Sequence, residues 1–203
     1  MQYYHDLITQ KSWQLLLSLK KKYDFVLIGG WAVYLYCQTL KSKDIDLIIN
    51  YPVLEQLKEE FTVVKNDRLK KYETKTEETD IDIYLPYYSE LGLPADEVIK
   101  LTTMLENFKV PDVEILALLK AKALLERKNS VKGRKDLIDL VSLFSLEGFD
   151  FKKLGQHARK FQSENLLRVI VEKVKSTTKI DELNLNVHKM AEFKRRTLPK
   201  LTV

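Results

Sequence analysis

The chain has 203 residues, 45% of them hydrophobic, so it can bury an apolar core and is unlike a disordered chain. Its single cysteine, Cys37, excludes an intramolecular disulfide and a zinc site built from cysteines. The N-terminus lacks a signal-peptide pattern, and no apolar run approaches the ~18 residues that span a bilayer. We therefore expect a cytoplasmic protein without a membrane partner.

The formal net charge of +5 is unevenly distributed along the chain. Residues 152–203 contain 13 Lys and Arg against 5 Asp and Glu. Such a basic region could contact RNA, DNA or another polyanion. Lysine-rich helices with solvated faces would give the same excess, so both interpretations stay open.

Apolar spacing and turn residues predict a mixture of helices and strands in the first half of the chain. Helices are predicted at residues 6–22, 31–40 and 52–60, the last opened by Pro52. Strands are predicted at residues 24–28, 44–49, 61–65, 69–76 and 80–85. Residues 101–105 and 107–110 are expected to pair through Glu106-Asn107, after a loop with one helical turn.

The pattern changes from Pro111 onward. Residues 111–128 begin with proline, carry acids in the first turn and bases in the last, and so predict a helix. Further helices are expected around residues 137–144, 163–175 and 187–197. We predict an α+β domain of residues 1–110 followed by a helical domain of residues 111–203.

Two consecutive glycines, Gly29 and Gly30, separate the strand at 24–28 from the helix that opens at Trp31. Glycine has no Cβ, so its backbone N–H groups can approach a ligand that a side chain would block. The N-terminus of the following helix also favours an anion. The pattern is typical of a phosphate-binding turn, although a tight turn without a ligand is the simpler alternative.

Two aspartates follow the glycines at a spacing of 14 positions from Gly30 to Asp44. In a strand, Asp44 and Asp46 share a face and lie about 6.5–7 Å apart. A divalent cation would relieve their repulsion, and Mg²⁺ is commonly held by carboxylates together with phosphate oxygens. Asp80 and Asp82 form a second such pair. Each pair alone is explained by an exposed strand face, but the combination with the glycine turn favours a metal and phosphate site.

The segments LIGGWAVYLYCQTLKSKDIDLII and DIDIYL resemble the signature of the DNA polymerase β-like nucleotidyltransferase superfamily, especially its small prokaryotic members. The resemblance implies a small mixed sheet with flanking helices. It assigns Gly29 and Gly30 to the triphosphate of a nucleoside triphosphate. Trp31, next to the glycines, and Lys43, next to Asp44, are further candidates for nucleotide binding. Many members have serine where this chain has Gly30, and the Gly-Gly form also occurs in the superfamily.

The same resemblance implies that Asp44 and Asp46 bind Mg²⁺ or Mn²⁺. Asp82 has apolar residues on both sides and fits the third carboxylate of the family, which orients or deprotonates the acceptor. Asp80 is the reserve candidate for that position.

Lys120 lies among apolar residues of the helix predicted at 111–128. Such a lysine either extends to solvent or reaches an anion at the domain boundary. With Asp136 in the downstream segment KDLIDL, it resembles the helical domain of toxin-type nucleotidyltransferases. The resemblance implies that Lys120 and Asp136 complete the active site.

The activity implied is the transfer of a nucleoside monophosphate from a nucleoside triphosphate to an acceptor hydroxyl on RNA, protein or a small molecule. A place in a toxin–antitoxin-like system and an acceptor held by the basic C-terminal region are part of this expectation. The alternative is a non-catalytic nucleotide- or RNA-binding module of the same fold.

Overall fold

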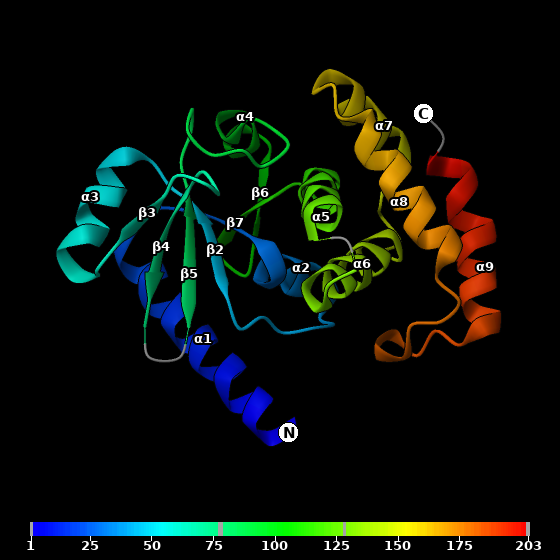
Figure 1. Cartoon of the computed structure of the whole chain (residues 1–203), viewed down its shortest axis with the longest axis horizontal. Coiled ribbons are helices and arrows are strands. Elements are labelled where there is room, and N and C mark those ends of the chain that lie inside the picture. Colours follow the sequence, from blue (N-terminus) through cyan, green and yellow to red (C-terminus); the bar gives the residue numbers. More distant parts are fainter. Residues whose placement is uncertain (1, 77–78, 128, 202–203) are drawn as a thin grey trace. The chain divides into compact units, whose positions relative to one another are not determined.

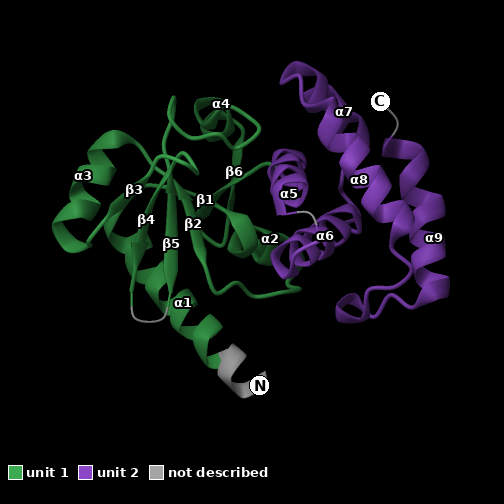
Figure 2. Ribbon diagram, viewed as in Figure 1, with its two compact units in different colours: residues 1–112 green, residues 113–203 purple. Residues whose placement is uncertain are grey.

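The computed structural model describes residues 2–76, 79–127 and 129–201 (Figure 1). The chain divides into two compact units, residues 1–112 and residues 113–203 (Figure 2). Lys128, the last residue of the helix predicted at 111–128, lies outside the described residues.

In the described part of the first unit, seven strands form one mixed sheet in the order β3-β4-β5-β2-β1-β7-β6. Neighbouring strands are antiparallel except for two parallel pairs, β2 with β5 and β1 with β7. The strands are β1 (Val26–Ile28), β2 (Ile45–Ile48), β3 (Val64–Asn66), β4 (Lys71–Lys75), β5 (Asp80–Tyr84), β6 (Thr102–Leu105) and β7 (Phe108–Pro111). The helices of this unit are α1 (Gln2–Lys22), α2 (Gly29–Cys37), α3 (Tyr51–Glu60) and α4 (Ala95–Lys100).

Along residues 45–47 of β2 and along β5, buried apolar residues alternate with polar ones. Ile45 and Leu47 on β2 are buried, as are Ile81 and Ile83 on β5, and the register pairs Ile45 with Ile81 and Leu47 with Ile83. Because side chains alternate along a strand, Asp46 and Asp82 project to the opposite face. The alternation expected from the sequence therefore sets which face carries the carboxylates.

An aromatic cluster joins α1, α2 and β7. The ring of Trp13 lies 4.9 Å from that of Trp31 and 5.7 Å from that of Phe108. The buried indole of Trp31 donates a hydrogen bond to Oγ of Ser12 at 2.9 Å. These contacts fix α2 on the sheet, so the glycine turn at its start is held in place.

The hairpin predicted at Glu106-Asn107 is confirmed. Leu105 on β6 pairs with Phe108 on β7, and the two turn residues have φ of 46° and 65°. Positive φ at both central residues is the requirement of a type I′ turn.

The second unit is helical in its described residues. Its helices are α5 (Val113–Arg127), α6 (Val131–Phe144), α7 (Phe151–Lys160), α8 (Glu164–Ser176) and α9 (Val187–Thr197), with short 3₁₀ turns at Asp181–Leu183 and Leu198–Leu201. Side chains cap several N-termini: Ser130 accepts from Gly133, and Asn186 accepts from Lys189. The predicted fold class, an α+β sheet unit followed by a helical one, is confirmed.

Two differences from the expected elements have local causes. The strand expected at 61–65 begins later, because Phe61 still donates its N–H to Leu57 of α3 as the helix C-cap. Helix α7 was not expected, since its ten residues are mostly basic or polar and include Gly155. Asp150 caps it by accepting from Lys152 and Lys153, and Leu154 and Ala158 are buried.

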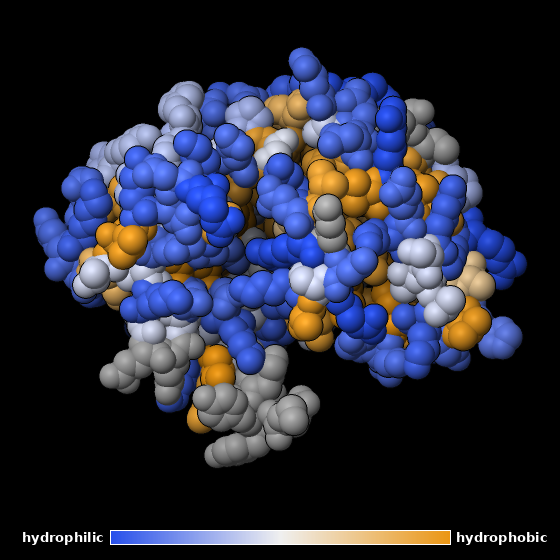
Figure 3. Space-filling view, in the orientation of Figure 1, coloured by the Kyte–Doolittle hydropathy of each residue, from blue (hydrophilic) through white to orange (hydrophobic). Residues whose placement is uncertain are grey.

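Polar residues cover most of the face shown in Figure 3, with apolar residues visible in smaller areas. Among the residues whose side chains the structure describes, the exposed large apolar ones come from separate elements: Leu7, Tyr51, Val64, Leu69, Tyr87, Met104, Val131 and Val187. Within the described ranges, none of the helices is both long enough and apolar enough to cross a membrane.

Candidate functional site

The carboxylates of two strands meet on the polar face of the sheet. The parallel register of β2 and β5 pairs Asp46 with Asp82, and the antiparallel register of β1 and β2 pairs Ile28 with Asp46. Paired residues of neighbouring strands share a face, and the strands lie about 4.8 Å apart. Asp46 and Asp82 are therefore neighbours, directly beside the end of β1 where the glycine turn begins.

Asp80 occupies a different position from Asp82. It pairs with Lys75 in the β4–β5 register, and its carboxylate lies 3.8 Å from Nζ of Lys75. Its side chain is 51% exposed, whereas that of Asp82 is 18% exposed. Of the two aspartates on β5, Asp82 is the one level with Asp46.

The glycine turn is shaped around Asp46. Gly29 has φ of +68°, and a Cβ at this residue would lie 2.0 Å from Oδ2 of Asp46. Gly30 is buried in the first turn of α2. The space beside Gly29 is thus occupied by the Asp46 carboxylate, and the approach of a phosphate to the glycine backbone, expected from the sequence, stays a prediction.

The remaining residues predicted for nucleotide binding lie close by in the sequence but in different environments. The side chain of Trp31 is buried in the aromatic cluster, so a ligand contact of this residue would come from its backbone N–H. Lys43 is exposed and Asp44 is half-buried, both just before β2 begins at Ile45.

Two residues of β4, Lys71 and Glu73, belong to this site and were not expected from the sequence. Nζ of Lys71 lies 2.6 Å from Oδ2 of Asp82 and 2.9 Å from Oε1 of Glu73. Glu73 is also the register partner of Asp82 and accepts a hydrogen bond from Asn66. Their alternation along residues 71–75 marks one face of a strand, but only the pairing of β4 with β5 brings that face to Asp82.

Burial and neighbouring charges shift the pKa values of Asp82, Lys71 and Glu73. Burial raises the pKa of the Asp82 carboxyl, and the negative charges of Glu73 and Asp44 raise it further against the hydrogen bond from Lys71. Burial works to lower the pKa of Lys71, but hydrogen bonds to Asp82 and Glu73 outweigh it, and the pKa is raised. The hydrogen bond from Lys71 lowers the pKa of Glu73. The Lys71 side chain is therefore a protonated ammonium next to two carboxylates.

The side chains at this site are of the type that binds a divalent cation, because carboxylate oxygens are suitable ligands of Mg²⁺ and Asp46 lies beside Asp82. Among the residues that the structure describes, however, no group of three or more His, Cys, Asp or Glu side chains is arranged to hold a metal ion. At Asp82, the ammonium of Lys71 lies where a cation would bind.

Solved structures of other proteins match nearly the whole chain. A candidate nucleotidyltransferase from Helicobacter pylori matches with a TM-score of 0.53 and 17% sequence identity, over 97% of this chain and 97% of the other. The protein JHP933 from Helicobacter pylori matches with a TM-score of 0.51 and 16% identity, over 98% of this chain and 92% of the other. This chain has a nucleotidyltransferase-like fold.

The resemblance inferred from the Gly-Gly turn and the Asp-x-Asp pair is confirmed at the level of the fold. No protein-family model matches the sequence, and no curated protein matches it. The roles of single residues in this nucleotidyltransferase-like chain therefore rest on the geometry of the sheet.

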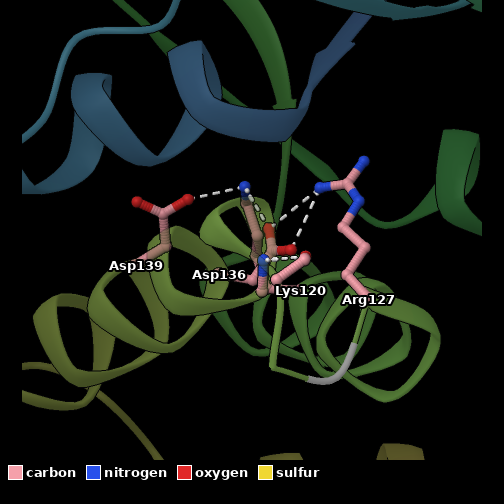
Figure 4. A network of polar contacts seen from close by, with 6 residues as sticks. Lys120, Arg127, Asp136 and Asp139 are labelled. Carbon is pink, nitrogen blue, oxygen red and sulfur yellow. Dashed lines mark hydrogen bonds and ion pairs between the residues drawn. The ribbon is translucent and has the colours of Figure 1, made fainter.

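In the helical unit, Lys120 and Asp136 belong to a buried ionic network (Figure 4). Nζ of Lys120 lies 2.6 Å from Oδ2 of Asp139 and 3.3 Å from Oδ1 of Asp136. Nη1 of Arg127 lies 3.0 Å from Oδ2 of Asp136. The Lys120 side chain is 8% exposed, so it does not extend to solvent, and its anionic partners are two carboxylates of α6 in the same unit.

Asp139 and Arg127 are the members of this network that were not predicted. Asp139 is fully buried and lies three residues after Asp136, so both carboxylates project from one side of α6. The Asp-x-x-Asp spacing in KDLIDL is the signal in the sequence that points to Asp139.

Proposed function

We propose that the chain is a metal-dependent nucleotidyltransferase that moves a nucleoside monophosphate from a nucleoside triphosphate to an acceptor hydroxyl. The observation that carries the proposal is the register of Asp46 with Asp82 beside Gly29, whose missing side chain makes room for the Asp46 carboxylate. The nucleotidyltransferase-like fold supports the same class of reaction.

In this proposal Asp44, Asp46 and Asp82 hold Mg²⁺ or Mn²⁺. The bound cation would supply charge neutralisation at the α-phosphate and at the leaving group. The backbone N–H groups of Gly29 and Gly30 donate hydrogen bonds to the triphosphate, at the N-terminus of α2. Lys43, exposed before the first of these aspartates, adds a positive charge for the phosphates.

The acceptor oxygen attacks the α-phosphorus, a new O–P bond forms, and the bond to the β-phosphate oxygen breaks, so pyrophosphate leaves. Asp82 orients the acceptor hydroxyl and takes its proton. Asp82 is level with Asp46 in the strand register, whereas Asp80 pairs with Lys75 and is exposed, so Asp82 is placed on the acceptor side.

The acceptor is an RNA, a protein or a small molecule, and the lysines and arginines of residues 152–203 offer a surface for a polyanionic one. A toxin–antitoxin-like context remains part of the proposal. The participation of Lys120 and Asp136 in the reaction stays a prediction of the family resemblance, because each is already paired within the helical unit.

One observation favours a second function, a non-catalytic nucleotide- or RNA-binding module. The Lys71 ammonium is bound to Asp82, the carboxylate that the reaction would need. If this ion pair is permanent, the sheet could still bind a nucleotide at Gly29 without transferring it.

Transfer of label tests the proposal directly. The protein is incubated with each α-³²P-labelled nucleoside triphosphate, Mg²⁺ or Mn²⁺, and either total RNA or total protein. We expect one pool to become labelled by the wild type and not by Asp46→Asn. Asp24→Asn is the matched control, because Asp24 is an exposed aspartate on the same unit and should label like the wild type. Nucleotide binding without labelled product for any nucleotide would leave the binding module as the function.

A further inference from the structure

Lys71 has an environment unusual for a strand lysine. Its side chain is 12% exposed, and its ammonium contacts two carboxylates, Asp82 at 2.6 Å and Glu73 at 2.9 Å. Lysines that only keep a sheet edge polar extend into solvent. Lys75, four residues later on the same strand, is of that kind, with a side chain that is 73% exposed.

The ammonium of Lys71 and a divalent cation would compete for the same oxygen. A magnesium ion binds carboxylate oxygen at about 2.0–2.1 Å, and Oδ2 of Asp82 already has Nζ of Lys71 at 2.6 Å. Two cations that close to one oxygen repel each other strongly in a half-buried site. Asp82 therefore binds one of them at a time through this oxygen.

Glu73 makes the exchange feasible. It lies opposite Asp82 in the strand register and is held by the amide of Asn66 at 3.1 Å. An ammonium released from Asp82 keeps its contact with Glu73, so it is not left buried without a partner. The two alternative partners of Lys71 lie on adjacent strands, within the reach of one side chain.

We propose that Lys71 is a tethered counter-ion that occupies Asp82 while no divalent cation is bound, and that it moves onto Glu73 when a cation binds. The proposal rests on the proposed function in taking Asp82 as a metal ligand. Its consequence is that Lys71 weakens the binding of a divalent cation at Asp82. The residue acts through Asp82 and is a positioning residue.

The test measures Mn²⁺ binding by calorimetry in the absence of nucleotide. Lys71→Met removes the competing ammonium, so we expect a dissociation constant about fivefold lower than that of the wild type, the factor expected for a partly exposed ion pair. Lys71→Arg keeps the cation and should stay near the wild type. Lys75→Met removes the same charge from the same strand, and it should also bind Mn²⁺ like the wild type.

A double variant shows whether Lys71 acts through Asp82. In an Asp82→Asn background, Lys71→Met should no longer change the affinity for Mn²⁺. A measurement on the unmutated protein guards against misfolding of the variants: Mg²⁺ should shift the side-chain NMR signals of Lys71 and leave those of Lys75 in place.

The outcomes separate this inference from the proposed function. If Lys71→Met binds Mn²⁺ more tightly but the wild type transfers no nucleotide, the counter-ion role stands and the enzymatic function fails. If binding depends on Asp82 and is unchanged or weakened by Lys71→Met, the counter-ion role is wrong while the function remains. Absence of Mn²⁺ binding in both proteins overturns the counter-ion role and the metal site together.

Discussion

Gly29 lies against the carboxylate of Asp46, at a distance that leaves no room for a side chain. A Cβ built on Gly29 would be 2.0 Å from Oδ2 and 2.6 Å from Cγ of Asp46. The glycine also has φ of +68°, a conformation that residues with a Cβ adopt only under strain. One residue thus joins the turn before α2 to the candidate metal ligand on β2.

The first prediction follows from this contact. Gly29→Ala should lower the free energy of unfolding by at least about 1–2 kcal/mol, because alanine is strained at positive φ and must displace Asp46. The folded fraction should also lose nucleotide affinity. Urea unfolding and nucleotide titration measure the two effects.

Gly155→Ala is the control for this prediction. The nearest atom to its Cβ would be Nη1 of Arg159 at 3.9 Å, within helix α7, so alanine should be neutral or stabilising by about 0.5–1 kcal/mol. Equal changes in the free energy of unfolding at the two glycines would contradict a steric requirement for glycine at residue 29.

The second prediction concerns the two aspartates of β5. Asp82→Ala should reduce nucleotide transfer by on the order of a hundredfold or more while sparing much of the nucleotide binding, because it removes the acceptor base. Asp80→Ala, on the same strand and exposed, should be milder. Rates from single-turnover labelling compare the two, and a larger loss for Asp80→Ala would reverse the assignment of the third carboxylate.

The third prediction concerns the pH dependence of stability. The pKa of Asp82 is raised by burial and by neighbouring negative charge, so the folded state holds its proton more tightly than the unfolded state does. As pH rises from the ordinary pKa near 3.8 to the raised pKa, the free energy of unfolding therefore falls. Above the raised pKa it stays at this lower value.

Asp82→Asn removes this titration, so it should flatten the pH dependence of the free energy of unfolding. The substitution should raise stability more at neutral pH than near pH 3. Urea unfolding between pH 3 and neutral pH measures this difference. Asp80→Asn serves as the comparison, and an Asp82→Asn curve parallel to the wild type would contradict the shift.

The fourth prediction concerns the ionic network of the helical unit. Lys120→Met leaves the buried carboxylate of Asp139 without its ammonium, and the loss of one partner of a buried pair lowers stability by about 3–5 kcal/mol. Lys122→Met, on the same helix, breaks a more exposed pair with Glu126 and should lower stability by about 0.5 kcal/mol or less. Thermal and urea unfolding measure both changes. Similar losses of stability in the two variants would mean that the ion pairs of Lys120 contribute little to the stability of the fold.

Local patterns in the sequence predict much of this fold. The alternation of apolar residues and aspartates in residues 44–49 and 80–85 predicts which face of each strand is buried, because side-chain direction has a period of two. Asn107 favours a tight turn because asparagine tolerates positive φ, and the Gly-Gly pair marks the start of α2. These are decided within a few residues of the chain, by steric limits on the backbone and by burial.

The pairing of distant segments was decided by the tertiary structure alone. The parallel register of β2 with β5 sets Asp82 rather than Asp80 beside Asp46, and a shift of two residues would have preserved the same buried face. Lys71 reaches Asp82 only because β4 lies next to β5, and Asp139 reaches Lys120 only through the packing of α6 on α5. Hydrophobic periodicity predicts which face of a strand or helix is buried, but not which other element lies beside it. The contacts between charged side chains therefore follow from strand order and helix packing.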